Sequence, residues 1–354
     1  MRIVLRPLLL RQTTTGGRRE GGIVAYELKD LLVVGVASSA LFDLTESDKY
    51  FRDHGEDAYR EYQDVHIDDT LSPGVAFPFV KRLLGLNNLR KEPLVEVIIL
   101  SRNDPDTGLR VMKSVQKHEL NITRAIFMQG RSPYHFMDAL SMSLFLSNSA
   151  KDVKDAIKQG FAAGQVVGEP AAAKENDDLR IAFDFDGVLA GDESEQIMQS
   201  SDLTAFHAHE LEHAAEPMTE GPLSSFLRGI NRVQDVEDGL VREAKNDGRD
   251  YNRRLHVAMV TARNAPSHER TIKHLRSVGL RVNDAFFLGG IEKASVLEVL
   301  RPHIFFDDQR GHLERAQKVV PSVHVPFGIT NIPRVEDEQP GDVPDGPASS
   351  IPEV

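Results

Sequence analysis

The feature that most constrains the fold of this chain is an internal repeat. A stretch that begins "VEVIILSRN" at Val95 aligns without a gap with one that begins "LHVAMVTARN" at Leu255. The offset of 160 residues also holds for three further pairs of positions: Ser101 and Thr261, Gly130 and Gly290, and Ser147 and Asp307. Any two α/β segments share some pattern, but a constant offset over about fifty residues, with aligned turns and glycines, favours a duplication.

Each copy contains the same expected elements: an apolar strand, a polar turn, an amphipathic helix, a second strand, another helix and a third strand. Upstream, "VVGVASSALFDLTES" aligns with "RIAFDFDGVLAGDES" at an offset of 147. Strands that alternate with helices form parallel βαβ units with right-handed crossovers. We therefore predict an α/β fold in which a parallel sheet has helices on both faces and is present as two related copies.

Composition along the chain predicts five regions. Residues 1–28 are basic and are expected to form a flexible leader, with a targeting segment as the alternative. The first copy spans 29–160, and the small and polar residues 161–178, "FAAGQVVGEPAAAKENDD", are expected to connect it to the second copy at 179–330. The second copy contains an insert at about 193–252, and residues 331–354, rich in Pro, Gly and acids, form an expected disordered tail.

Overall composition restricts the partners of the chain. A formal net charge of −12 disfavours a nucleic-acid polymer or an anionic membrane as partner. No apolar run approaches the roughly 20 residues that span a bilayer. The chain has no cysteine, which excludes disulfides and thiolate metal sites and fits a cytoplasmic location. We expect a small-molecule substrate, and assembly into a homo-oligomer stays open.

Two carboxylates end the first strand of the second copy. Asp184 and Asp186 follow the apolar residues of "RIAF", and Gly187 comes next. Side chains two residues apart in a strand share a face, and ligands of parallel sheets bind at the carboxyl ends of the strands. Because neighbouring carboxylates repel each other and a phosphate, the pair predicts a divalent cation such as Mg²⁺. Gly187 permits the sharp turn and the close backbone approach that a bound phosphate needs.

Further polar residues follow the later strands of this copy. Thr261 ends "HVAMVT", and its hydroxyl and the backbone N–H of Ala262 are candidates for binding a phosphate oxygen. Lys293, beside the glycine turn of "FFLGGIEKAS", can neutralise charge on a phosphoryl group. "HIFFDDQ" supplies Asp307 and Asp308. Each residue alone fits a helix cap, a turn or a solvated side chain, but their common placement after apolar strands favours a phosphoryl site.

This constellation resembles the haloacid dehalogenase-like superfamily of phosphoryl-transfer enzymes. Longer segments between about residues 31 and 328 are similar to one branch, the cytosolic 5′-nucleotidase type I family: "VASSALFDL", "SPGVAFPFVKRL", "LRIAFDFDGVLAGDESE", "GPLSSFL", "VTARNAPSHER" and "RPHIFFDDQRGHLERAQ". The resemblance implies a Mg²⁺-dependent hydrolase that converts nucleoside 5′-monophosphates to nucleoside and phosphate. The alternatives are a phosphatase for another small ester, such as a sugar phosphate, and a non-catalytic nucleotide sensor.

The resemblance also implies the catalytic roles. Asp184 would be the nucleophile that forms an aspartyl-phosphate, and Asp186 would act first as general acid and then as general base. Phe185 stands between them where the family often has glycine, so the substrate preference of the family is not carried over.

Ligands for Mg²⁺ follow from the same resemblance. They would be Asp184, the backbone carbonyl of Asp186, and Asp308, with Asp307 as its neighbour or alternate. Phosphate binding is implied for Thr261 and Lys293.

The insert of the second copy contains three histidines, in "FHAHELEHAAEPM". His209 and His213 have the i, i+4 spacing of a metal site, and "HELEH" at 209–213 matches the HExxH pattern, but we favour histidines on an exposed helix, together with His207. We expect the insert to be a helical cap that closes over the nucleoside and excludes water. "EGPLSSF", around Gly221, is expected to be its ligand-facing loop or the start of a helix.

The first copy lacks the charged set. The residues at the corresponding positions are uncharged: Ala37, Ser39, Pro133, Ser147 and Asn148. A phosphoryl site with Mg²⁺ cannot be built from them, so we expect a structural role, with a nucleoside pocket, an oligomer interface or an effector site as alternatives. Three residues after its second strand, Arg102, Asn103 and Asp104, are candidates for a ligand contact.

Overall fold

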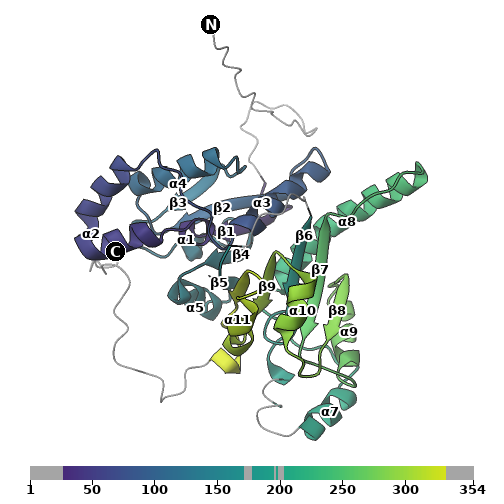
Figure 1. The fold of residues 1–354 in the computed structure, drawn as a ribbon. Helices are drawn as coiled ribbons and strands as arrows, with labels where there is room; N and C mark the ends of the chain where they lie inside the picture. Colours follow the sequence, from purple (N-terminus) through teal and green to yellow (C-terminus); the bar gives the residue numbers. More distant parts are fainter. Residues whose placement is uncertain (1–26, 171–177, 195–196, 198–202, 332–354) are drawn as a thin grey trace.

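The structure is a computed structural model that describes residues 27–170, 178–194, 197 and 203–331. Its centre is one ten-stranded sheet with the order β3-β2-β1-β4-β5-β10-β9-β6-β7-β8 (Figure 1). All neighbouring strands are parallel except β5 and β10, which are antiparallel. The predicted α/β class with a mostly parallel sheet is confirmed. Nearly all of the expected leader and tail lie outside the described residues.

The two halves of the sheet have the same strand order. The first half contains β1 (Leu32–Val36), β2 (Val95–Ser101), β3 (Arg124–Phe127), β4 (Met142–Ser147) and β5 (Ala163–Val167). The second half contains β6 (Leu179–Phe183), β7 (Leu255–Thr261), β8 (Asp284–Phe287), β9 (Ile304–Asp307) and β10 (Ser322–His324). The bounds of β2 and β7, and those of β3 and β8, differ by the same 160 residues as the sequence repeat.

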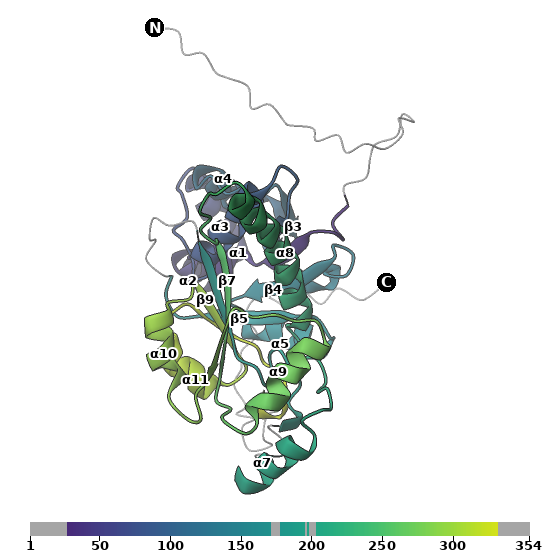
Figure 2. The ribbon, with the colours of Figure 1, turned by 90° about the vertical axis from the view of Figure 1, so that its right-hand side faces the viewer.

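Helices cover both sides of the sheet. Those of the first half are α1 (Ser38–Leu41), α2 (Thr45–Val65), α3 (Phe77–Gly85), α4 (Pro105–Lys117) and α5 (Ala150–Lys158). Those of the second half are α7 (Leu203–Glu212), α8 (Ser224–Asn246), α9 (His268–Ser277), α10 (Lys293–Leu300) and α11 (Arg310–Ala316). Short 3₁₀ turns occupy Leu86–Leu89, Pro133–Phe136 and Ile329–Asn331. In the second half, α10 and α11 lie on one side of the sheet, and α8 and α9 lie on the other (Figure 2).

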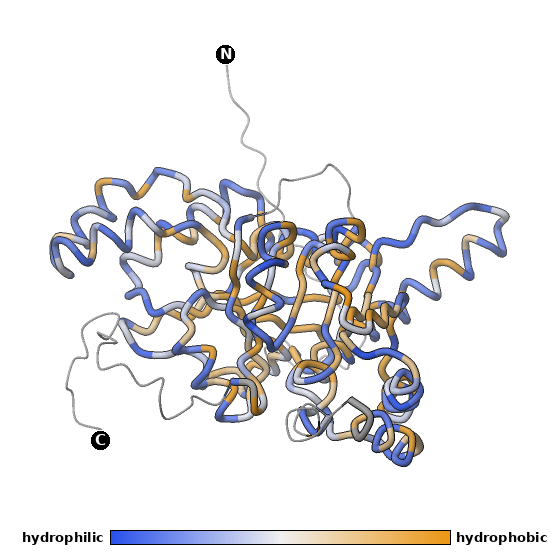
Figure 3. The backbone as a smooth tube through the Cα atoms, turned by 60° about the horizontal axis from the view of Figure 1, so that its bottom comes forward, coloured by the Kyte–Doolittle hydropathy of each residue, from blue (hydrophilic) through white to orange (hydrophobic). Residues whose placement is uncertain are grey.

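The strands in the middle of each half are largely apolar, with Glu96 in β2 and Arg180 in β6 among the exceptions. Every residue of β1 and β2 is buried, as expected for parallel strands that are covered on both faces. Figure 3 shows the resulting concentration of hydrophobic segments in the sheet. No helix in the described part of the chain has the length and apolar character needed to cross a bilayer.

The structure differs from the expected connector at residues 163–167, which form β5. This strand pairs with β4 on one side and with β10 of the second half on the other. Its small residues are needed for close packing, since a Cβ added at Gly164 would lie 2.2 Å from Cγ1 of Val323. Residues 163–167 therefore have a composition typical of a flexible linker but form the strand at which the two halves meet.

The expected cap also differs from the structure, because α8 is partly a core helix. Its first half buries Phe226, Leu227 and Ile230, and the helix packs against β1 and β4 of the first half. In Figure 1 the far end of α8 projects away from the sheet. Of the helices expected to form the cap, α7 lies at the edge of the molecule beside α9 (Figure 2).

We predict that Gly164→Ala destabilises the protein by about 1–3 kcal/mol, because the added methyl group overpacks the contact with Val323. Combined with Val323→Ala, its cost should be smaller than in the wild-type background. Urea unfolding of the two single variants and the double variant measures this coupling. Gly239→Ala is the matched control, since a Cβ there meets nothing within 4 Å; equal costs for the two alanine variants would contradict the packing argument.

A second prediction concerns His303, at the start of β9. Its Nδ1 accepts a hydrogen bond from the backbone N–H of Arg180 at 2.9 Å, and burial together with Arg82 and Arg180 lowers its pKa to about 4. The unfolded chain therefore binds a proton more readily, so stability is full above the ordinary histidine pKa of 6.5 and falls by about 3 kcal/mol as the pH drops through 4. His303→Gln should flatten the pH dependence of the unfolding free energy in this window. An unchanged slope would contradict the assignment.

Candidate active site

The two predicted acids follow β6 at the carboxyl end of the sheet. The backbone N–H of Asp184 donates to the carbonyl of Phe306 at 2.8 Å, which ties this position to the strand β9 beside it. Asp184 is buried, whereas the side chain of Asp186 is 18% exposed. Phe185 between them is fully buried and lies edge-on to the ring of His274. The two acids also have different partners, which divides the site into two parts.

The first part is a buried group of three charges. The Nζ of Lys293, at the start of α10, lies 2.6 Å from Oδ2 of Asp184 and 2.7 Å from Oδ2 of Asp307. All three side chains are at most 5% exposed. Three elements that are distant in sequence, the end of β6, the start of α10 and the end of β9, therefore meet at one point.

Burial and mutual charge shift the pKa values of these groups. Burial raises the pKa of Asp184 to about 7, with Asp307 and Asp186 adding to the rise and Lys293 opposing it. Burial also favours a higher pKa for Asp307, but Lys293 and His312 outweigh this effect and lower the pKa. The pKa of Lys293 is raised, because its two carboxylate partners outweigh the effect of burial. The ammonium therefore stays charged and favours the ionised carboxylates.

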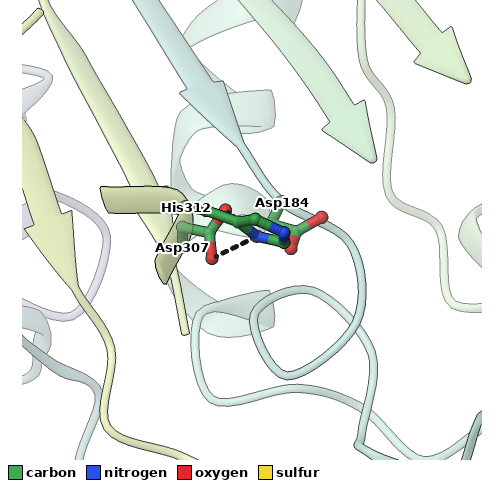
Figure 4. Close-up of side chains that lie close together, drawn as sticks. All are labelled: Asp184, Asp307 and His312. Carbon is green, nitrogen blue, oxygen red and sulfur yellow. Dashed lines mark hydrogen bonds and ion pairs between the residues drawn. The ribbon is translucent and has the colours of Figure 1, made fainter. Parts of the chain in front are cut away.

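Ligand-type atoms of Asp184, Asp307 and His312 lie within 4.8 Å of one another (Figure 4). His312, on α11, places Nδ1 3.2 Å from Oδ2 of Asp307. Two carboxylates and an imidazole suit a divalent cation, and carboxylate oxygens suit a hard one. The residues present thus fit a divalent metal. His312 was not predicted, although its position one helical turn after the acidic pair was a usable signal.

Asp308, the other acid of the pair, lies against the turn after β6. A Cβ added at Gly187, which has a φ of 70°, would lie 2.6 Å from Cγ of Asp308. The backbone carbonyl of Asp308 accepts hydrogen bonds from His324 Nε2 and Asn331 Nδ2. The absence of a side chain at Gly187 therefore allows the acidic turn and the Asp308 carboxylate to approach each other. The two acids of the pair have distinct places, Asp307 beside Lys293 and Asp308 beside Gly187.

Two of the predicted phosphate-binding residues, Ala262 and Lys293, line a hollow of about 180 Å³ together with Gly290 and His312. Ala262 is exposed and follows Thr261, which is buried at the end of β7. The Thr261 hydroxyl accepts the backbone N–H of Arg263 at 3.2 Å and keeps its own proton to donate. The hollow thus combines an ammonium, an imidazole and exposed backbone.

The second part of the site surrounds Asp186 and was not predicted from the sequence. Arg263 binds both carboxylate oxygens of Asp186, each at 2.7 Å, and also pairs with Glu210 of α7. Arg263 was detectable as a charged residue directly after an apolar strand, the criterion that identified the acids. Glu210 stands out in the sequence as the glutamate of "HELEH", but that pattern does not predict its pairing with Arg263.

The three histidines of the insert do not form a metal site among the described residues. His207 contacts Asn264 through Nε2 at 3.0 Å, and the rings of His209 and His213 stack at 4.1 Å. Gly221 packs against the turn after β6, because a Cβ there would lie 2.4 Å from the carbonyl oxygen of Val188. "EGPLSSF" thus supports the acidic turn and leads into α8.

The corresponding region of the first half is closed by short polar contacts. Ser39 Oγ donates to Asn148 at 2.6 Å, and the hydroxyls of Ser38 and Ser101 lie 2.9 Å apart. Arg102 forms two hydrogen bonds with the buried carboxylate of Asp152. The predicted ligand candidate Asp104 instead caps α4 and pairs with Arg60.

Fold and site together define an α/β protein with a buried charged centre at the carboxyl ends of parallel strands, where ligands of such sheets bind. A family model described as 5′-nucleotidase matches residues 24–332, so the chain belongs to the 5′-nucleotidase family. It is 33% identical over 299 residues to cytosolic 5′-nucleotidase 1B of Homo sapiens. The alignment covers 82% of this chain and 48% of that relative, so the chain spans about half the relative's length. The resemblance to the cytosolic 5′-nucleotidase type I family is confirmed.

We predict that Lys293→Met destabilises the protein by roughly 3–5 kcal/mol at neutral pH, because Asp184 and Asp307 lose their shared cation. In the folded state the pKa of Asp307 then rises above the unfolded value of 3.8 and the already raised pKa of Asp184 rises further, so stability should fall more steeply than in the wild type as the pH rises from 4 to 8. Thermal unfolding in metal-free buffer across this range measures the effect.

Lys151→Met is the matched control, since it breaks an exposed i, i+4 pair with Asp155 and should cost less than about 0.5 kcal/mol. A Lys293→Met variant whose melting temperature does not change with pH would contradict the buried-charge argument.

Proposed function

We propose that this protein is a Mg²⁺-dependent 5′-nucleotidase that hydrolyses nucleoside 5′-monophosphates to nucleoside and phosphate. The observation that carries the proposal is the buried group of Asp184, Lys293 and Asp307 at the carboxyl end of the sheet, in a chain of the 5′-nucleotidase family. A cytoplasmic location accords with the name of the human relative.

The proposed reaction has two steps. A carboxylate oxygen of Asp184 attacks phosphorus, the bond to the 5′-oxygen breaks, and Asp186 donates a proton to the departing nucleoside oxygen. Asp186, now a carboxylate, then takes a proton from water, whose oxygen attacks the aspartyl-phosphate and regenerates Asp184. Because burial raises the pKa of Asp184, the cation of Lys293 is needed to favour its nucleophilic, ionised form.

Binding of the phosphoryl group is assigned to the residues around the hollow. Lys293 offsets the charge on the phosphoryl oxygens, and Thr261 and the backbone N–H of Ala262 donate hydrogen bonds to them. Mg²⁺ would be held by Asp184, the backbone carbonyl of Asp186 and Asp308, with Asp307 anchoring Lys293 beside them. When bound, the metal supplies positive charge that offsets the phosphate and the carboxylates.

We infer that the two halves arose by duplication of a haloacid dehalogenase-like unit, residues 29–160 and 179–330. Their common strand order and the constant sequence offset support this inference. Helix α7 is the proposed cap element, since it contacts the acidic site through Glu210 while lying outside the sheet. The first half, without the charged set, is proposed to be structural.

The test is a panel assay of phosphate release from nucleoside 5′-monophosphates, a hexose phosphate and p-nitrophenyl phosphate. We expect the nucleoside monophosphates to give the highest kcat/KM, activity to vanish in chelator, and added Mg²⁺ to restore it. Asp184→Asn should lower kcat by at least roughly 1,000-fold, the scale for loss of a nucleophile.

Three outcomes would count against the proposal. Preference for the hexose phosphate would replace the nucleotidase with a phosphatase of other specificity. Retained turnover in Asp184→Asn would overturn the covalent mechanism. Thermal stabilisation by nucleotides without any turnover would indicate a sensor.

A further inference from the structure

A second group of buried charges joins the acid/base candidate Asp186 to the insert. Arg263 is 3% exposed at its side chain, and its Nε and Nη2 donate to the two oxygens of Asp186 at 2.7 Å each. This bidentate geometry fixes the plane of the carboxylate as well as its position. Asp186 is therefore oriented by a side chain that comes from the end of the neighbouring strand β7.

The other nitrogen of Arg263 contacts the insert. Nη1 pairs with Glu210 of α7, whose side chain is fully buried, and Glu210 also accepts Nη1 of Arg270 at 2.8 Å. Ser194 bridges the two, because it accepts from Arg263 at 2.6 Å and donates to Glu210 at 2.9 Å. The guanidinium of Arg263 is thus bonded on one edge to Asp186 and on another to α7.

Aromatic contacts hold the same guanidinium from both parts of the chain. Its central carbon lies 5.0 Å from the ring centre of Phe185, beside Asp186, and 5.8 Å from that of Phe206 on α7. A buried guanidinium in such an enclosure cannot reorient without breaking several charge-assisted bonds at once. The position of α7 and the orientation of Asp186 are therefore coupled through Arg263.

We propose that Arg263 is a positioning residue for Asp186 and that Glu210 couples the position of α7 to Arg263. Proton transfer to the leaving group then depends on the insert. This inference rests on the proposed function. With both oxygens bonded to Arg263, Asp186 is held at one position; without Glu210, Arg263 loses the partner that fixes its far edge. Arg263 and Glu210 act on the proton donor and not on phosphorus.

A positioning role of Arg263 can be distinguished from simple structural support by comparing substrates with different leaving groups. A nucleoside alkoxide is a strong base and needs a proton as it departs, whereas p-nitrophenolate is a weak base and departs without one. The constant kcat/KM reports the steps up to that departure, and hydrolysis of the aspartyl-phosphate comes later. A defect in positioning the proton donor therefore lowers kcat/KM for nucleoside monophosphates selectively, while a general structural defect lowers it for both substrates.

The experiment compares Arg263→Lys and Glu210→Gln with the wild-type protein on a nucleoside 5′-monophosphate and on p-nitrophenyl phosphate, with Mg²⁺ present. We expect kcat/KM for the nucleotide to fall by roughly 10- to 100-fold, up to the lower limit of what general acid catalysis contributes, and that for the aryl ester by less than about threefold. Glu210→Gln preserves the shape of the side chain, so it provides the test if Arg263→Lys does not fold. Asp152→Asn is the matched control, because it weakens a buried carboxylate–arginine pair in the first half and should leave the ratio of the two constants unchanged.

An equal loss for both substrates in Arg263→Lys and Glu210→Gln would overturn the positioning role and leave the nucleotidase proposal intact. A wild-type protein that hydrolyses neither substrate would overturn the proposed function and this inference with it. A ratio that changes equally in Asp152→Asn would also overturn the inference, since the effect would then come from the loss of any buried ion pair.

Discussion

The site depends on the enforced proximity of buried carboxylates. Asp184 and Asp307 each end a parallel strand, and the sheet places β6 and β9 side by side, so their charges meet in a region with little access to water. Burying them without a cation would be strongly unfavourable, and Lys293 supplies the cation from the start of α10. The same concentration of negative charge that requires Lys293 makes the cluster suitable for a divalent metal and, once neutralised, for a phosphate.

The first half shows what the fold does without this constraint. Its strands have the same order, but an alanine, two serines and an asparagine replace the four acids, and short hydrogen bonds such as Ser39 to Asn148 join the uncharged side chains. One arginine–carboxylate pair, Arg102 with Asp152, remains near the strand ends, and it is satisfied internally by Ser132 as well. The fold therefore does not by itself create the charged centre.

The parallel α/β class and the acids of the site were predictable from the sequence, since Asp184, Thr261 and Asp307 follow apolar strands of the second copy. Other features depend on contacts between distant segments. The pairing of Glu210 with Arg263 is seen only when α7 is placed beside the end of β7. Residues 163–167 have the composition of a linker, and their role as a strand follows from the packing of Val323 against Gly164. His312 follows the acidic pair by one helical turn, but its contact with Asp307 is established by the placement of α11 beside β9. Periodicity predicts which residues end a strand, whereas pairing of charges across elements follows only from the tertiary arrangement.

The first half also contributes physically to the half that contains the site. Each half alone would end in an edge strand, β5 or β10, with unpaired backbone groups, and the antiparallel pairing of these two strands removes both edges. Helices of each half also pack against strands of the other half: α8 packs against β1 and β4, and α3 packs against β6. Since β6 carries Asp184 and Asp186, the first half helps to fix the strand on which the chemistry is proposed to occur. A buried ion group tolerates little displacement, so a half that supplies only packing still has a definite part in maintaining the site.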